Sequence, residues 1–255
     1  MILLSFDIEE FDLPKEHGVD ISFEESMRVS KEGTRIILQT LKEMGAKATF
    51  FCTTNFAENA PELIRQIVAD GHELASHGCD HFNPKEEDVS RSKPMLEAIG
   101  GVTVRGYRQP RMGKVSYEAL AQAGYTYDAS LHPTAIPGRY NHRDLPRLPF
   151  QEGRVMEIPT SVTPWLRIPL FWLAFHNYPW WMYKLLCRWT HRHDGLFVIY
   201  FHPWEFVELA EHPEWKVPAI IKRGAGKQMV KRLSAMASLF GKDAFQTFSH
   251  FLLLV

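Results

Sequence analysis

The stretch Glu73-Leu74-Ala75-Ser76-His77-Gly78-Cys79-Asp80-His81 places two histidines directly after a short apolar run. A spacing of four residues puts two imidazoles on one side of a helical turn, close enough to share one metal ion. Because the chain has 12 histidines, a chance pair with this spacing is not rare. The pair alone therefore fits a metal site and ordinary loop histidines about equally well. The residues around it in the rest of the chain favour one of these two interpretations.

Short apolar runs alternate with segments of helical periodicity along most of the chain. This alternation over short connections predicts an α/β fold with a parallel sheet, closed as a barrel. A chain of 255 residues is long enough for one large domain, which we expect to span residues 1–255. The expected strands are 2–6, 48–52, 72–75, 102–107, 125–128, 155–158 and 196–201, and the expected helices are 26–44, 61–70, 95–99, 117–123 and 227–240.

Reactive side chains gather at or just beyond the carboxyl ends of the expected strands. Active sites of parallel α/β folds are built at that edge of the sheet. Seven independent accidents of this kind are improbable, so the pattern predicts a catalytic site. The residues concerned are Asp7, Glu9, His77, His81, Arg108, Asp128 and His202.

The acidic cluster after the first strand supplies a third candidate metal ligand. Successive side chains of a strand point to opposite faces, so Asp7 and Glu9 share one face and Ile8 takes the other. We therefore treat Asp7 and Glu9 as a functional pair. Glu10 and Asp12 are expected to be exposed loop charges.

Composition and charge exclude several classes of protein. A net charge of -1 leaves no basic footprint for nucleic acid. Three widely spaced cysteines indicate neither a disulfide framework nor a Cys-x-x-Cys metal motif. The N-terminal residues lack the basic region and cleavage site of a signal peptide, so we expect a cytoplasmic protein.

Five short motifs occur in a fixed order along nearly the whole chain. Each is weak alone, but their order makes the set specific. They are Ser5-Phe6-Asp7-Ile8-Glu9, His77-Gly78-Cys79-Asp80-His81, Arg108-Gln109-Pro110, Tyr127-Asp128-Ala129-Ser130 and Val198-Ile199-Tyr200-Phe201-His202.

This order resembles the polysaccharide deacetylase family, also called the NodB homology family or carbohydrate esterase family 4. The resemblance implies a distorted (β/α)7 barrel, one divalent metal ion that is usually zinc, and hydrolysis of N- or O-acetyl groups on sugars. The segment Tyr200-Phe201-His202-Pro203-Trp204-Glu205 resembles a divergent branch associated with exopolysaccharide biosynthesis. The expected partner is an acetylated glycan or its precursor.

Two positions depart from the family pattern. Ile8 stands where most members carry a metal-binding Asp, and the strand alternation favours Glu9 as the replacement ligand. Gly78 stands where the family usually has Ser or Thr, which removes a hydroxyl group but neither expected ligand.

With the resemblance, the candidate residues take specific roles. Glu9, His77 and His81 are the expected metal ligands, a donor set that suits zinc and also iron, cobalt or nickel. Asp7 is the expected general base, and Arg108 is expected to pair with it and keep it ionised. His202 is the expected general acid. Asp128 is expected to orient His202, which is the weakest of these links.

Three further residues are assigned to substrate binding. The backbone N–H of Arg111 is a candidate donor to the oxyanion. Trp204 is expected either to stack on a sugar ring or to pack inside the fold, and Tyr200 lies two residues before His202 on the same strand.

Residues 162–189 hold five tryptophans among further aromatic residues, basic residues and prolines, a mixture that excludes a spanning helix. These side chains either cover the outside of the barrel or rest on a membrane interface to reach a lipid-linked glycan.

Two functional alternatives to a glycan deacetylase stay open from the sequence. One is a hydrolase of a small cyclic amide, which some divergent members of the superfamily are. The other is a carbohydrate-binding protein that has lost activity, which the departure at Ile8 would favour.

Overall fold

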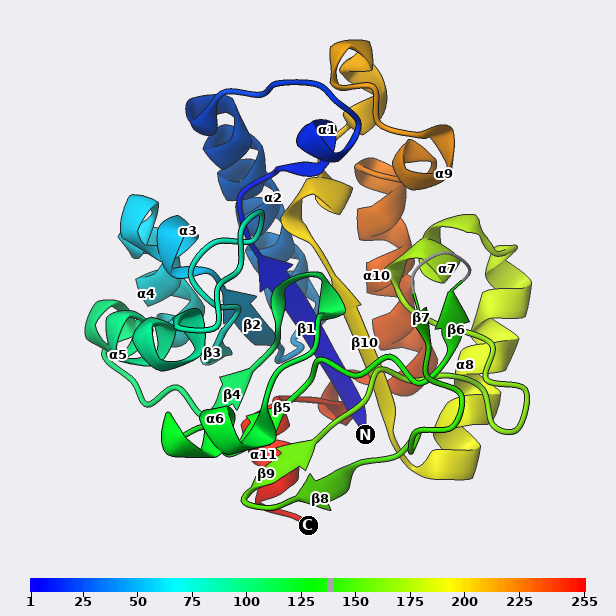
Figure 1. Ribbon diagram of the computed structural model, residues 1–255. Helices are drawn as coiled ribbons and strands as arrows, with labels where there is room; N and C mark the ends of the chain where they lie inside the picture. Colours follow the sequence, from blue (N-terminus) through cyan, green and yellow to red (C-terminus); the bar gives the residue numbers. More distant parts are fainter. Residues whose placement is uncertain (137–139) are drawn as a thin grey trace.

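The computed structural model describes residues 1–136 and 140–255, and its centre is a curled parallel sheet (Figure 1). The sheet order is β10-β1-β2-β3-β4-β5-β9-β8, and in the described residues every pairing from β10 to β9 is parallel. β8 runs antiparallel to β9, and the short strand β11 pairs with β1. The bounds are β1 (Ile2–Ile8), β2 (Thr49–Cys52), β3 (Glu73–Ser76), β4 (Gly106–Tyr107), β5 (Tyr127–Asp128), β8 (Phe150–Glu152), β9 (Val155–Glu157), β10 (Phe197–Phe201) and β11 (Phe245–Gln246).

The expected α/β class and the distorted (β/α)7 arrangement are confirmed. Seven parallel strands follow one another from β10 to β9, but the pairings recorded for the described residues leave β8 and β10 at opposite edges. The sheet is therefore a curled, incompletely closed barrel. A small separate hairpin, β6 (Ala135–Ile136) with β7 (Tyr140–Asn141), stands beside it.

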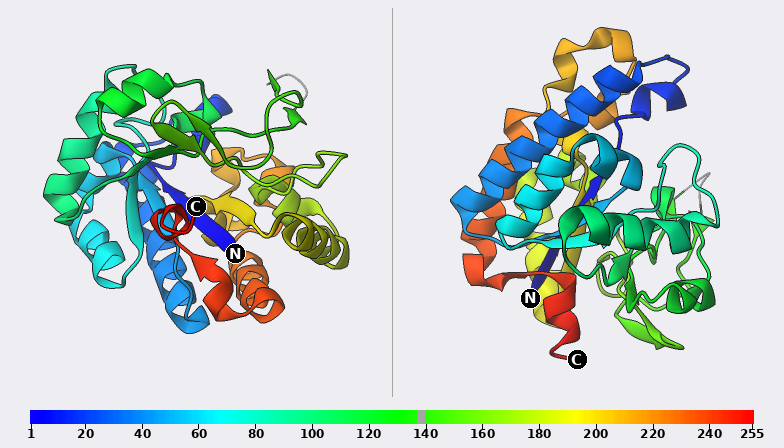
Figure 2. Two further views of the ribbon diagram at one scale, coloured as in Figure 1. Left: turned by 90° about the horizontal axis from the view of Figure 1, so that it is seen from below. Right: turned by 90° about the vertical axis from the view of Figure 1, so that its left-hand side faces the viewer.

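Most of the helices lie around the outer side of the curled sheet, whereas α11 packs through Phe248 against Leu3 and Phe51 (Figure 2). The longest of those described, α2, begins at an N-cap where Ser22 accepts a hydrogen bond from the Glu25 amide, and it ends at Gly45 in the left-handed conformation. The helix bounds are α1 (Leu13–Glu16), α2 (Phe23–Met44), α3 (Thr54–Asn59), α4 (Pro61–Ala69), α5 (Asp88–Gly100), α6 (Tyr117–Gln122), α7 (Trp172–Asn177), α8 (Trp180–Asp194), α9 (Ala219–Lys222), α10 (Lys227–Phe240) and α11 (Phe248–Leu252).

Several elements differ from the sequence expectation. Helix α5 begins at Asp88 and runs through Pro94, whereas the apolar pattern alone predicted only residues 95–99. β4 and β5 are two residues long, because pairing in the curled sheet covers only part of each apolar run. α7 and α8 were not predicted, since their aromatic and basic residues obscure a simple helical period. Within residues 1–136 and 140–255, no helix has the length and apolar character needed to cross a membrane.

A close backbone contact joins α2 to the segment that follows β10. Here the 3-10 helix η2 (Pro203–Phe206) lies against Gly33, and a Cβ atom at Gly33 would stand 1.9 Å from the carbonyl oxygen of Pro203. Neither helix backbone can give way cheaply, so this position requires glycine. The contact fixes where the chain turns after His202.

We expect Gly33→Ala to lower the free energy of unfolding by about 1–3 kcal/mol, because the added methyl group must displace the η2 backbone. Urea unfolding followed by circular dichroism measures the change. Arg35→Ala, an exposed position on the same helix, is the matched control and should stay within about 0.5 kcal/mol of the parent. Equal stability of Gly33→Ala and the parent would contradict the contact.

Candidate metal and catalytic site

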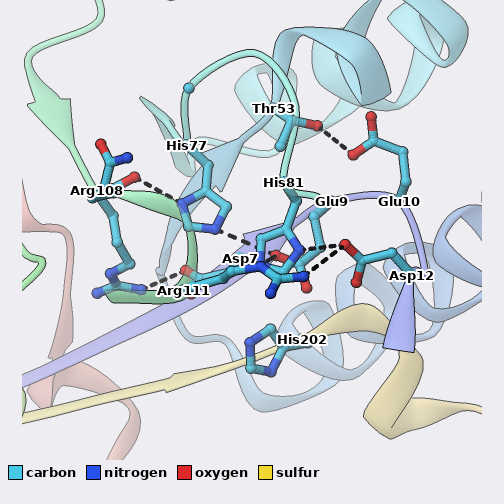
Figure 3. A network of polar contacts seen from close by, with 12 residues as sticks. Asp7, Glu9, Glu10, Asp12, Thr53, His77, His81, Arg108, Arg111 and His202 are labelled. Atoms are coloured by element: carbon cyan, nitrogen blue, oxygen red, sulfur yellow. Dashed lines mark hydrogen bonds and ion pairs between the residues drawn. The ribbon is translucent and has the colours of Figure 1, made fainter. Parts of the chain in front are cut away.

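Three buried side chains from two strand ends converge on one point (Figure 3). Glu9 follows β1, and His77 is the first residue after β3. The Glu9 Oε2 atom lies 3.3 Å from His77 Nε2 and 3.2 Å from His81 Nε2. One ligand atom from each residue falls within 4.8 Å of the others, and all three residues are buried. The structure thus brings together the three residues expected as metal ligands.

The chain turn after His77 explains one departure from the family pattern. Gly78 has a φ of +73°, a left-handed conformation that side chains rarely adopt. Ser or Thr at this position would be strained. Glycine therefore lets the chain turn sharply between the two histidines.

The outer ring nitrogens set the orientation of both imidazoles. His77 Nδ1 lies 2.8 Å from the carbonyl oxygen of Arg108, and His81 Nδ1 lies 2.7 Å from Asp12 Oδ2. A carbonyl or an ionised carboxylate can only accept, so each Nδ1 carries the hydrogen. With Nδ1 holding a hydrogen in each ring, the Nε2 atoms of His77 and His81 face Glu9 and would offer their lone pairs to a metal ion in the neutral form. Imidazoles that bind metals in proteins are held in this way.

The electrostatics of the cluster favour a bound cation. Burial opposes ionisation of Glu9, but the charge of His81 and the contact with His77 outweigh it and lower the pKa of Glu9 to about 2. Burial likewise opposes protonation of His81, yet Glu9 and Asp12 raise its pKa to about 9. The Oε2 atom of Glu9 is buried without a hydrogen-bond partner. An unsatisfied carboxylate oxygen facing two imidazole nitrogens fits a metal site.

Asp7 is held beside this cluster by a buried arginine. The Arg108 side chain is fully buried, and its Nη1 donates to Asp7 Oδ1 at 2.5 Å and to Ser5 Oγ at 3.0 Å. Its Nε donates to the Ala129 carbonyl oxygen, and its guanidinium group lies 4.0 Å from the centre of the Phe51 ring. The expected pairing of Arg108 with Asp7 is present. The arginine fixes the orientation of the carboxylate and compensates its charge.

His202 lies on the other side of the cluster and has an unexpected partner (Figure 3). Its Nδ1 is 2.8 Å from Glu205 Oε1, and Glu205 Oε2 is 2.7 Å from Nε2 of the buried His176. Burial opposes the charged form of His202, but the hydrogen bond to Glu205 and the charges of Glu9 and Asp7 raise its pKa. A raised pKa favours the protonated form of His202, which a general acid requires.

The expectation that Asp128 orients His202 is wrong in this structure. Asp128 stands opposite Glu157 in the register of β5 and β9 and accepts a hydrogen bond from Ser130 Oγ at 2.7 Å. Burial raises the pKa of both carboxyl groups. Ser130 Oγ in turn accepts from the Gln109 amide, so Asp128 supports the loop after Arg108. The i,i+3 spacing of His202 and Glu205 was the signal for the true partner.

Glu10 and Asp12 are buried, which corrects the expectation that both are exposed. Asp12 holds His81, and Glu10 accepts a hydrogen bond from Thr53 Oγ1 at 3.1 Å. Burial raises the pKa of Glu10 to about 7. Asp12 also precedes α1 as its N-cap residue, a position that is commonly exposed, and no local pattern reveals that its tertiary partner is His81.

Arg111 lies in a strained turn next to the cluster. Arg111 and Met112 have φ angles of 60° and 52°, which are uncommon for residues other than glycine and often mark functional sites. The Arg111 side chain lies 3.1 Å from Glu16 and 3.9 Å from Asp12. The role of its N–H as an oxyanion donor stays a prediction.

Trp204 and Tyr200 are buried, at 4% and 5% exposure, and do not offer a free ring face to a sugar. The Trp204 ring stacks on His202 with the centroids 4.9 Å apart and the planes 16° apart. Tyr200 packs against His202 and stacks on Phe171. The packing alternative for Trp204 is the one that the structure supports, while the assignment of Tyr200 to substrate binding stays a prediction. Both rings limit the movement of His202.

Comparison with known proteins gives one family model and several relatives. The model described as polysaccharide deacetylase matches residues 13–127. This segment includes His77, His81 and Arg108, while Asp7, Glu9 and His202 lie outside it.

Curated relatives match over part of their length. A peptidoglycan deacetylase of Helicobacter pylori is 32% identical over 104 residues, which are 37% of this chain and 36% of the relative. A chitooligosaccharide deacetylase of Sinorhizobium fredii is 44% identical over 109 residues, 40% of this chain and 50% of the relative. The chain thus spans between a third and half of the length of these relatives.

The whole fold is similar to solved structures. A putative polysaccharide deacetylase from Mycobacterium smegmatis superposes with a TM-score of 0.64 at 21% sequence identity, covering 98% of this chain and 87% of that one. At this identity the likeness concerns the fold. Residues 13–127, which include both histidines, thus match the polysaccharide deacetylase model, and the chain is similar to curated deacetylases over part of its length.

Proposed function

We propose that residues 1–255 form one catalytic domain that hydrolyses acetyl groups, foremost N-acetyl groups, on a sugar of a polysaccharide or its precursor. The observation that carries this proposal is the meeting of Glu9, His77 and His81 beside the ion pair of Asp7 with Arg108. Glu9, His77 and His81 would hold one divalent metal ion, with zinc as the first choice. Bound there, such an ion would act as a Lewis acid toward the acetyl carbonyl group and would lower the pKa of water.

The chain's own residues divide the proton transfers. Asp7, fixed by Arg108, takes a proton from the attacking water as general base. His202, fixed by Glu205, donates a proton to the departing amine nitrogen. The Arg111 N–H is proposed to stabilise the oxygen that gains negative charge. Asp7, Glu9 and His202 are buried, with exposed fractions of 3%, 2% and 9%.

The buried position of Glu9 supports an active site over a binding protein that has lost activity. Ile8 lies fully within the apolar core, and the following residue, Glu9, reaches both histidines. Glu9, the residue directly after β1, would therefore replace the Asp that is missing at position 8. A hydrolase of cyclic amides would use the same residues, so substrate trials with acetylated oligosaccharides and small cyclic amides have to separate these two reactions.

We expect Asp7→Asn to lower kcat for acetate release from chitooligosaccharides by about 10²–10⁴-fold, because an amide cannot accept the proton of the attacking water. Asn keeps an acceptor for Arg108, so thermal unfolding and metal content should stay near the parent values. Asp20→Asn, an exposed carboxylate outside the site, is the matched control. Parent-level turnover by Asp7→Asn would exclude Asp7 as the base.

We expect Glu205→Gln to move the basic limb of the kcat–pH profile to lower pH by about one unit. His202 must be protonated to act as an acid, so activity falls as the pH rises through its pKa. Removing the Glu205 charge takes away a contact that raises this pKa, while burial continues to lower it. Glu211→Gln, an exposed neighbour, should keep the parent profile. A basic limb that stays in place in Glu205→Gln would contradict the role of this pair.

A further inference from the structure

The outer side of α8, together with the loop 163–168, forms an exposed apolar surface, here called the α8 surface. The exposed fractions are 78% for Trp165, 71% for Leu166, 68% for Trp181 and 61% for Leu185. The opposite side of α8 packs into the fold through Tyr183 and other buried residues. A helix that is apolar on both sides usually has a partner on its outer side.

The loop 163–168, which precedes α7, presents two of these side chains. Trp165 and Arg167 have φ angles of 60° and 52° and lie in the left-handed region. Arg167 anchors the loop through hydrogen bonds from Nη1 to the carbonyl oxygens of Leu145 at 2.7 Å and Pro133 at 3.2 Å. The Trp165 ring contacts Trp189 of α8 with centroids 5.7 Å apart. Backbone strain at residues other than glycine persists only where the surrounding structure holds it, and it is often found at functional sites.

The segment that carries the α8 surface is rich in basic residues and poor in acidic ones. Residues 158–193 contain no Asp or Glu, although the chain as a whole has a net charge of -1. Arg188 and Arg192 are exposed on α8, and with Leu185 and Trp189 they line a surface depression of about 450 Å³. Asp194, the last residue of α8, is paired with Arg147.

We propose that the α8 surface binds the interface of an anionic lipid membrane. Tryptophan and leucine side chains enter the boundary between headgroups and acyl chains, while arginines bind anionic headgroups. The excess of cations beside exposed apolar side chains favours this occupant over an uncharged protein surface. The candidate site lies at the strand ends, whereas α8 lies at the side of the molecule and contacts β10 (Figure 1). This inference is independent of the proposed reaction.

Co-sedimentation of the full chain with vesicles tests the proposal. At low salt the parent should bind vesicles of phosphatidylcholine with phosphatidylglycerol and shift its tryptophan emission to the blue, but bind pure phosphatidylcholine weakly. The combined change Trp165→Ser, Trp181→Ser and Leu185→Ser should lower partitioning into anionic vesicles by at least about tenfold. Arg188→Glu with Arg192→Glu should abolish the preference for anionic lipid.

Phe23→Ser and Ile220→Ser, which remove exposed apolar side chains outside the α8 surface, are the matched controls and should bind like the parent. All variants should keep the parent's circular dichroism and its rate on soluble substrate, which separates loss of binding from misfolding. Absence of parent binding to anionic vesicles at low salt would overturn the proposal. An equal loss of vesicle binding in the control variants would also overturn it. The same holds if the parent binds no vesicles but forms a dimer in sedimentation velocity that Trp181→Ser disrupts.

Discussion

The site depends on one buried carboxylate that faces two imidazole nitrogens. An ionised Glu9 in the interior needs a compensating positive charge, because an isolated buried charge is costly. His77 and His81 direct their Nε2 atoms at it, and the arrangement keeps the pKa of Glu9 at about 2. A divalent cation bound there would satisfy all three groups at once. The ends of β1 and β3, which are separated only by β2, supply the rigid frame for this convergence.

A second layer of side chains keeps the reactive groups in place. Asp12 and the Arg108 carbonyl oxygen each fix the hydrogen of one imidazole, and the Arg108 side chain fixes Asp7. On the far side, Glu205 joins His202 to the buried His176. Each reactive group thus has one buried partner that sets its orientation, which is how preorganised sites lower the cost of reaching a transition state. Gly33 lets the backbone after His202 approach α2 closely enough to complete this arrangement.

The sequence predicted what short-range patterns encode. Strand alternation placed Asp7 and Glu9 together, and the strand ends predicted that His77, His81, Arg108 and His202 would meet. The sequence-based prediction failed where contacts between distant segments determine the position of a side chain. No sequence pattern reveals that Asp12 contacts His81. The register of β5 and β9 places Asp128 opposite Glu157 and not beside His202. Exposure was equally hard to foresee, since the same aromatic residue type is buried at Trp204 and largely exposed at Trp165. Only the three-dimensional packing separates those two tryptophans.

Metal stoichiometry is the most direct measurement of the central claim, that Glu9, His77 and His81 form one metal site. Elemental analysis after reconstitution with zinc or cobalt should give close to one equivalent of metal per chain in the parent. The control Glu10→Gln should give the same value, because the Glu10 carboxylate accepts a hydrogen bond from Thr53 and does not face the two histidines. Glu9→Ala should lose most of the metal while staying folded by circular dichroism. No metal in the reconstituted parent, or full occupancy in Glu9→Ala, would contradict the account.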